Sequence, residues 1–249
     1  MKFFFLLVLS LFLACAPTFH VRNMEISFVD LKDSAIAADS AFIAEISPYK
    51  SRLDKTMNEV LNVSEVAMTK DLPEGLLGNF VADVIFKKAN DYFHPEDGKA
   101  VHACILNNGG LRTSLPKGEI LRGKIFELMP FENELSVIAI SGKNIQQLFE
   151  YLAKSGGAPV AGITMGIENG MPVHALISGE PVDSTQTYHV VTSDYLANGG
   201  DKYSFFRDPL KRYDLGIKVR DAIIEFVIEE KQKGKTLNSQ LDRRIHYVQ

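Results

Sequence analysis

The sequence has 249 residues, of which 46% are hydrophobic and 23% are charged, and its formal net charge is −4. This composition is that of an ordinary globular protein and argues against extensive disorder. Because the chain is slightly acidic and contains no Lys/Arg-rich stripe, polymeric DNA and RNA are excluded as expected partners.

The N-terminal part carries an apolar run over residues 3–14, preceded by Lys2. The run is shorter than the roughly 20 residues that a membrane-spanning helix needs, so it predicts a signal peptide over residues 1–15. Its last residues, LFLAC at 11–15, resemble the lipobox of bacterial lipoproteins. We expect export, a lipid on Cys15 and membrane attachment facing the periplasm or the cell surface. The alternative is a cleaved signal peptide without a lipid, which predicts a soluble periplasmic protein.

Cys104 is the second of the two cysteines, and it lies in the apolar run 100–106. A thiol in such a run is expected to be buried and inert. If Cys15 carries a lipid, no intramolecular disulfide can form, so the fold depends on its hydrophobic core.

Residues 16–42 are predicted to form a tether, with a strand over 24–31, that leads into a single domain over residues 43–249. At the start of this domain, apolar residues recur at helical spacing between positions 43 and 61. They predict one long helix that packs on the core, with Pro48 at a kink or in a first turn.

A second apolar stripe, over residues 76–93, predicts a helix that packs on a sheet. Gly156-Gly157 is expected to end a third helix, over 145–152, in a left-handed cap, and Asn169-Gly170 predicts a hairpin. Further strands are predicted at 100–106, 134–140, 159–167, 171–177, 188–192 and 245–248, with a loop at 193–201 and a helix at 215–233. Helices interleaved with hairpins indicate mixed sheets, hence the α+β class.

Residues 107–112 (NNGGLR) directly follow a predicted strand. Gly109 and Gly110 allow the backbone to turn tightly and to approach a ligand closely. Arg112 offers a planar, permanently charged fork for phosphate oxygens, and Asn107 can both donate and accept hydrogen bonds. The motif favours a phosphate-bearing ligand, but by itself it is equally compatible with a plain glycine turn and a surface arginine.

Three further motifs accompany it in the sequence: Gly78-Asn79 at the start of the second helix, MPFEN at 129–133 and YLANGGD at 195–201. Taken together and in this order, the four motifs resemble the C-terminal, substrate-binding domain of the 5'-nucleotidase family. The resemblance covers about residues 43–247. It implies a domain of mixed sheets layered with helices, an α/β/β/α-type sandwich, that binds a nucleotide or nucleoside.

The resemblance assigns the aromatic residues a role in base binding. Phe131 matches one of two rings that sandwich the nucleobase, and Tyr195 matches the other, at a position where the family usually has Phe. Stacking of this kind accepts any base, and it is worth about 1–3 kcal/mol per base. The alternative is that Phe131 belongs to the core, Tyr195 to the surface, and that Asp201 caps a turn.

The polar residues match positions that bind the rest of the nucleotide. Asn133 matches a residue that hydrogen-bonds the base edge, and Asp201 matches the carboxylate that accepts from the ribose hydroxyls. Asn107 and Arg112 match the pair that lines the ribose and the phosphate. The loop backbone at these motifs is formed by Gly109, Gly110, Gly199 and Gly200.

One position departs from the family pattern. An arginine commonly stands about eight residues before the Gly-Asn pair, and this sequence has Asp71 there, with Lys70 beside it. We expect weaker contact with the phosphate, or imperfect replacement by Lys70, and no change in nucleoside contacts.

The sequence lacks the Asp, His and Asn motifs of the metallophosphoesterase domain that carries two metals in this family. The histidines are scattered, at His20, His94, His102, His174, His189 and His246, and are expected to be ordinary surface or strand residues. We therefore expect no catalytic residue, no metal and no cofactor in this chain. Divalent metals are expected only in a partner metallophosphoesterase.

These observations leave several hypotheses open. The first is the recognition part of a split 5'-nucleotidase-type phosphoesterase in nucleotide catabolism, with hydrolysis supplied by a separately encoded metallophosphoesterase. The second is a non-catalytic, nucleotide-binding surface lipoprotein for uptake or sensing. The third is a degenerate scaffold with no ligand, and the fourth is unaided phosphatase activity.

Overall fold

The computed structural model describes residues 23–28 and 39–248. The predicted signal peptide and the lipidation at Cys15 lie outside these residues. The chain divides into two compact units, Met1–Ser47 and Pro48–Gln249. Residues 23–28 are exposed and form no regular structure, so the strand predicted over 24–31 is wrong for its described part. None of the described helices is long and apolar enough to cross a membrane.

Helix α2 (Ser40–Met57) is the long helix that the apolar spacing predicts, with Pro48 inside it. None of its residues is buried, so the expectation that it packs on the core is wrong. Val60 and Leu61 continue the apolar pattern, but they belong to strand β1 (Val60–Ser64). Periodicity alone therefore predicted the helix but not its end or its surroundings.

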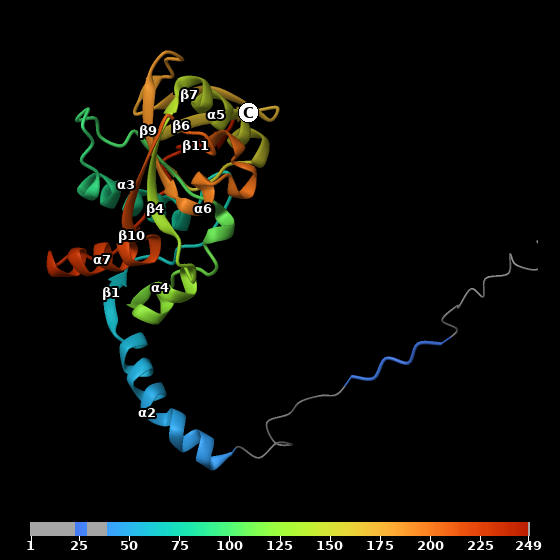
Figure 1. Cartoon of the computed structure of the whole chain (residues 1–249), viewed down its shortest axis with the longest axis vertical. Coiled ribbons are helices and arrows are strands. Elements are labelled where there is room, and N and C mark those ends of the chain that lie inside the picture. Colours follow the sequence, from blue (N-terminus) through green and yellow to red (C-terminus); the bar gives the residue numbers. More distant parts are fainter. Residues whose placement is uncertain (1–22, 29–38, 249) are drawn as a thin grey trace, which may run out of the picture. The chain divides into compact units, whose positions relative to one another are not determined.

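A mixed sheet forms the centre of the second unit (Figure 1). Its strands, in spatial order, are β10 (Lys211–Lys218), β4 (Glu134–Ser141), β9 (Thr187–Ser193), β2 (Ala103–Ile105) and β5 (Val160–Ala161). Strands β2 and β9 are parallel, whereas the other pairs are antiparallel. The central strands are buried on both faces, which explains their continuous Val/Ile-rich sequences.

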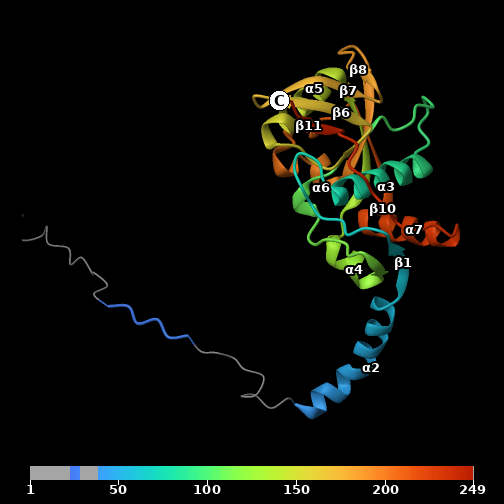
Figure 2. The same ribbon diagram turned by 180° about the vertical axis from the view of Figure 1, so that it is seen from behind.

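Helices α3 (Leu76–Tyr92) and α7 (Val219–Gln232) contact each other and cover one face of this sheet (Figures 1 and 2). The shared core includes Cys104, which is fully buried as predicted, and burial raises the pKa of its thiol. Helix α4 (Arg122–Leu128) also contacts α7. Strand β3 (Gly118–Leu121) pairs with β1 in a small antiparallel sheet.

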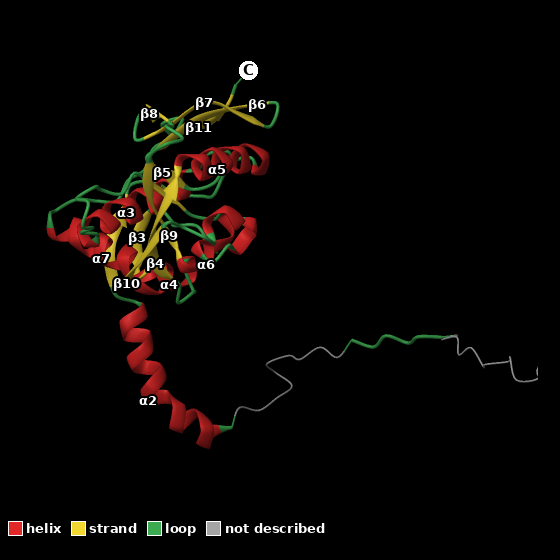
Figure 3. Cartoon of the chain, turned by 45° about the horizontal axis from the view of Figure 1, so that its top comes forward, coloured by secondary structure: helices red, strands yellow, loops and turns green. Residues whose placement is uncertain are grey.

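Helix α5 (Gly142–Ser155) covers the opposite face (Figure 3). Beyond α5 lies a second sheet, with the order β11 (Ile245–Tyr247), β6 (Ile163–Glu168), β7 (Met171–Ile177) and β8 (Glu180–Pro181). One hydrophobic core joins α5 to both sheets. The predicted α+β class is confirmed, and α5 lies between the two sheets.

Local turn chemistry explains several elements. Helix α5 ends at Gly156 with φ 79°, the left-handed cap that the glycine pair predicts. The β6–β7 hairpin turns through Asn169 and Gly170, both with positive φ. Two predictions are corrected: β10 extends to Lys218, so the last helix begins later than position 215, and the loop at 193–201 contains the short helix α6 (Asp194–Ala197).

Candidate functional site

A cavity of about 360 Å³ lies at one edge of the central sheet. It contains every side chain that the sequence motifs assign to ligand binding, namely Asn107, Arg112, Phe131, Asn133, Tyr195 and Asp201. Gly109 and Gly110 also line it, together with Leu106, Met129, Ser193 and Val219. Motifs that are far apart in the sequence therefore meet in one place.

The sheet topology explains this meeting. Strands β2 and β9 are parallel neighbours, so their carboxyl ends reach the same edge, where the first leads into Asn107 and the second into Tyr195. Strand β4 runs antiparallel to β9, with Leu135 opposite Ser193. Its start therefore lies at that edge as well, which places Phe131 and Asn133 beside the other motifs.

The two predicted stacking rings are accessible in this cavity. Phe131 is 41% exposed and Tyr195 is 45% exposed. Neither ring belongs to a hydrophobic core cluster, so their surfaces remain available to a flat ligand. The alternative that Phe131 is a core residue does not fit this exposure.

Contacts on both sides hold the Phe131 loop. The guanidinium carbon of Arg112 lies 5.9 Å from the centre of the Phe131 ring. From α7, Nη1 of Arg220 donates to the carbonyl of Phe131 at 3.3 Å, and the backbone N–H of Val219 donates to the carbonyl of Asn133 at 2.9 Å. Arg220 is only 5% exposed, so a nearly buried cation fixes the backbone beside the ring.

Tyr195 and Asn107 both donate to the carboxylate of Asp201. The Tyr195 hydroxyl lies 2.7 Å from Oδ1, and Nδ2 of Asn107 lies 2.5 Å from Oδ2. The hydrogen bond to Asp201 raises the pKa of Tyr195. Each carboxylate oxygen keeps further acceptor capacity, so Asp201 is held in place and can still accept from a ligand hydroxyl.

The backbone around Asp201 is tightly constrained. Asp201 has φ 47° and ψ 35°, in the left-handed region where non-glycine residues are uncommon. The Tyr151 hydroxyl donates to its carbonyl at 2.6 Å. A Cβ added at Gly200 would lie 2.5 Å from the Tyr195 ring, so only glycine lets the loop pass this ring so closely. Gly199 and Gly200 therefore support the cavity without lining it.

Asn133 is tied to helix α6. Its Nδ2 donates to Oδ1 of Asp194 at 2.7 Å, and the backbone N–H of Tyr195 donates to the same oxygen at 2.7 Å. Asp194 thus connects the residue expected at the base edge with the residue expected to stack on the base. The sequence motifs did not single out Asp194, although it directly precedes Tyr195.

Two other contributions had no signal in the sequence. Arg220 and Val219 reach the site from α7, which is far from the other motifs along the chain. Conversely, Lys70 and Asp71, at the position that departs from the family pattern, are exposed and do not line the cavity. Oδ1 of Asp71 accepts from the N–H of Leu72 at 2.8 Å.

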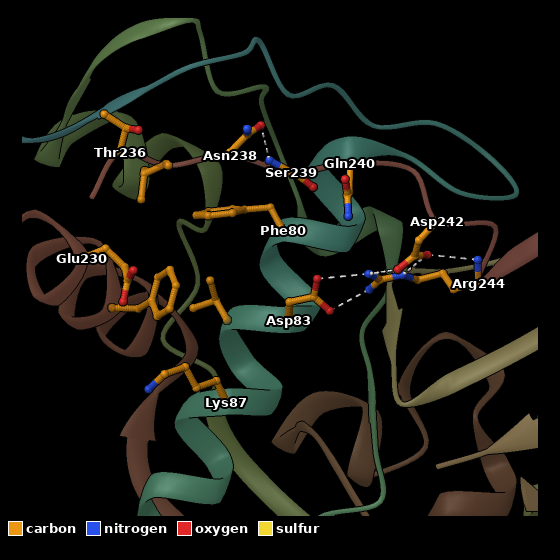
Figure 4. Close-up of a pocket in the computed structure, with 13 residues that line it drawn as sticks. Phe80, Asp83, Lys87, Glu230, Thr236, Asn238, Ser239, Gln240, Asp242 and Arg244 are labelled. Atoms are coloured by element: carbon orange, nitrogen blue, oxygen red, sulfur yellow. Dashed lines mark hydrogen bonds and ion pairs between the residues drawn. The ribbon is translucent and has the colours of Figure 1, made fainter. Parts of the chain in front are cut away.

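A larger pocket of about 510 Å³ lies elsewhere, between α3, α7 and the segment that precedes β11 (Figure 4). It contains none of the predicted binding residues. Its most ordered feature is Arg244, which pairs in a bidentate manner with Asp83 and also pairs with Asp242. These contacts join the C-terminal segment to α3, so we assign this pocket's charged residues a structural role.

Among the residues that the structure describes, no group of three or more His, Cys, Asp or Glu side chains is arranged to hold a metal ion. His102 and His189 do lie together, with ring centres 5.8 Å apart. His189 is 3% exposed, and the pKa of His102 is lowered, chiefly by burial. This pair belongs to an aromatic cluster with Phe93 and Tyr213, and not to a metal site.

Comparisons with known proteins agree with the site. The chain is 29% identical over 225 residues to the trifunctional nucleotide phosphoesterase protein YfkN of Bacillus subtilis (strain 168), covering 82% of this chain and 15% of that protein. It is 25% identical over 246 residues to the 5'-nucleotidase of Mus musculus, covering 87% and 42%. The solved structure of a 5'-nucleotidase precursor from Thermus thermophilus matches with a TM-score of 0.69 and 26% identity, covering 85% and 44%.

The chain thus spans less than half the length of these relatives. The family model for the 5'-nucleotidase C-terminal domain matches residues 55–208, which include all the residues of the motifs that line the cavity. The chain therefore belongs to the 5'-nucleotidase family and carries its C-terminal domain.

Proposed function

We propose that this protein recognises a nucleotide or nucleoside in the cavity at the edge of the central sheet, as the recognition part of a split 5'-nucleotidase-type phosphoesterase. The observation that carries the proposal is that one cavity gathers two accessible aromatic rings, an arginine and a polar clamp on Asp201. These are the groups that a base, a phosphate and a sugar require.

Each part of the ligand has a matching group. The base stacks between Phe131 and Tyr195, because every base offers a flat π-face. The ribose hydroxyls donate to Asp201, whose carboxylate Tyr195 and Asn107 hold in position. Arg112 carries the only cation among the described residues that line this cavity, and it faces the phosphate with a planar fork of donors.

Hydrolysis is assigned to a separately encoded metallophosphoesterase that supplies divalent metals. Two observations support this assignment. The described residues contain no cluster of metal-binding side chains, and the chain spans less than half the length of its nucleotidase relatives. The partner completes the site by placing its metals beside the phosphate, where they stabilise the developing charge.

The place of action is an exported one, with the protein attached to a bacterial membrane through a lipid on Cys15. The apolar run before Cys15 supports export. One relative, 25% identical over 243 residues, is the cell wall protein Lmo0130 of Listeria monocytogenes. Metabolic labelling with an alkyne fatty acid tests the lipid, because Cys15→Ser must abolish the label if the anchor is at this residue.

Titration calorimetry with adenosine and AMP tests the recognition step. We expect Phe131→Ala and Tyr195→Ala each to weaken binding by about 1–3 kcal/mol, because each removes one stacking ring. Tyr49→Ala is the matched control, since Tyr49 is exposed and lies outside the cavity. If the wild-type protein bound neither ligand, the recognition function would be wrong.

The split enzyme is tested by mixing the protein with a purified metallophosphoesterase encoded near it. We expect nucleotide hydrolysis to rise above that of the partner alone, and Phe131→Ala to abolish the increase. Binding of nucleosides without any increase in hydrolysis would favour the alternative function, a binding lipoprotein for uptake or sensing.

A further inference from the structure

Asn133 lines the cavity, and its side-chain amide has a defined orientation. Nδ2 lies 2.7 Å from Oδ1 of Asp194. A carboxylate at neutral pH only accepts hydrogen bonds, so it must face the NH₂ group of the amide and not the carbonyl oxygen. The chemistry of the pair therefore settles the orientation that an isolated asparagine amide leaves ambiguous.

The other end of the amide remains free for a ligand. None of the hydrogen bonds among the described residues uses Oδ1 of Asn133 as an acceptor. Nδ2 has a second hydrogen in addition to the one that it gives to Asp194. Asn133 can thus offer an acceptor and a donor side by side, the pattern with which asparagine binds the amino group and a ring nitrogen of adenine.

Asp194 is itself held firmly. Its Oδ1 also accepts from the backbone N–H of Tyr195 at 2.7 Å, in the first turn of α6. The helix has an independent cap, because the Ser193 hydroxyl accepts from the N–H of Leu196. The Asp194 side chain is therefore not needed to cap the helix, which leaves the orientation of Asn133 as its distinct role.

We propose that Asp194 is a positioning residue that fixes the Asn133 amide and thereby makes the cavity selective for adenine-type bases, which carry an amino group, over their oxo counterparts. This inference rests on the proposed nucleoside binding. An oxo base places a carbonyl oxygen against Oδ1 of Asn133. Rotation of the amide would relieve that repulsion, but it would bring Oδ1 against the Asp194 carboxylate without any proton between them.

The test compares adenosine with inosine, which differ at this amino or oxo position, by calorimetry on the full chain. The wild-type protein is expected to bind adenosine about tenfold more tightly than inosine, within the range of a bidentate base contact. In Asp194→Ala the amide can rotate, so the ratio is expected to fall below about threefold while adenosine binding is mostly retained. Asp194→Asn keeps a carbonyl oxygen at the same place and restores most of the selectivity.

Asn133→Ala supplies the reference, because it removes the amide altogether. Its adenosine-to-inosine ratio is expected to match that of Asp194→Ala, and the double variant is expected to show no further change, since the two residues act as one unit. Circular dichroism and the melting temperature establish that each variant is folded.

Two results would overturn the inference alone: equal binding of adenosine and inosine by the wild-type protein, or an equal loss of both ligands in Asp194→Ala. The second result is what a merely structural role of Asp194 predicts. If the wild-type protein bound neither nucleoside, the proposed function would fail, and this inference with it.

Discussion

The Tyr195 hydroxyl donates a hydrogen bond to Oδ1 of Asp201 at 2.7 Å, which joins the expected base-stacking ring to the expected sugar-binding carboxylate. The family usually has phenylalanine at this position, which cannot make this bond. Because Tyr195 is also connected to Asp194 through its backbone N–H, residues for the base and for the sugar form one network.

The hydroxyl and the ring of Tyr195 are expected to contribute separately to binding. Tyr195→Phe removes only the hydrogen bond to Asp201, and both residues are exposed, so we expect a loss of less than about 1 kcal/mol in nucleoside binding. Tyr195→Ala also removes the stacking surface and should cost about 1–3 kcal/mol. Calorimetry with adenosine checks both values, and equal losses in the two variants would contradict a stacking role.

Gly200 is expected to be required for the position of the Tyr195 ring. In Gly200→Ala the new Cβ would lie 2.5 Å from that ring, so the ring or the loop must move. We expect nucleoside binding to weaken by about 1–3 kcal/mol through loss of stacking, with the overall fold retained.

Gly78→Ala is the control for this substitution, because its Cβ would meet its nearest neighbour, Pro159, at an ordinary 3.4 Å. Alanine also favours the helix in which Gly78 lies. Calorimetry and thermal melting of both variants test the pair. Unchanged binding in Gly200→Ala would mean that the ring does not contact the ligand.

Glu132 is expected to stabilise the site in a pH-dependent manner. Hydrogen bonds from Lys218 and Arg220 lower the pKa of Glu132 to about 2, from an ordinary 4.5. A carboxyl whose pKa is lowered on folding stabilises the folded state above the unfolded value, and that contribution is lost as the pH falls through the folded value. The difference in melting temperature between wild type and Glu132→Gln should therefore be largest above about pH 4.5 and shrink toward pH 2. A difference that stays constant over this interval would exclude the ion pair as its cause.

Arg244 is expected to be the main polar link between the C-terminal segment and α3. It makes paired hydrogen bonds to Asp83 and to Asp242, and donates to the carbonyl of Val160. Hydrogen bonds to charged groups contribute about 1.5–3 kcal/mol, so Arg244→Met should lower the free energy of unfolding by about 2–3 kcal/mol in chemical denaturation. Arg243→Met, at the neighbouring position, makes no such pairs and should have little effect.

Several features followed from the sequence because they depend on neighbouring residues. The stripe that forms α3, the Gly156 cap of α5 and the Asn169-Gly170 hairpin each express a local periodicity or a turn preference. The residue types of the binding motifs were also evident, because a stacking ring, an arginine fork and a glycine turn are recognisable one motif at a time.

The sequence determined the α+β class and the residues that line the cavity, but only the tertiary structure decided how these residues are held. Strand β10 and the exposure of α2 depend on what packs against each segment, which local periodicity does not encode. The link between Arg220 and Phe131 joins residues 89 positions apart, and the link between Asn133 and Asp194 joins residues 61 positions apart. Such pairs arise from the order and direction of the strands in the sheet, because backbone topology brings their loops to one edge.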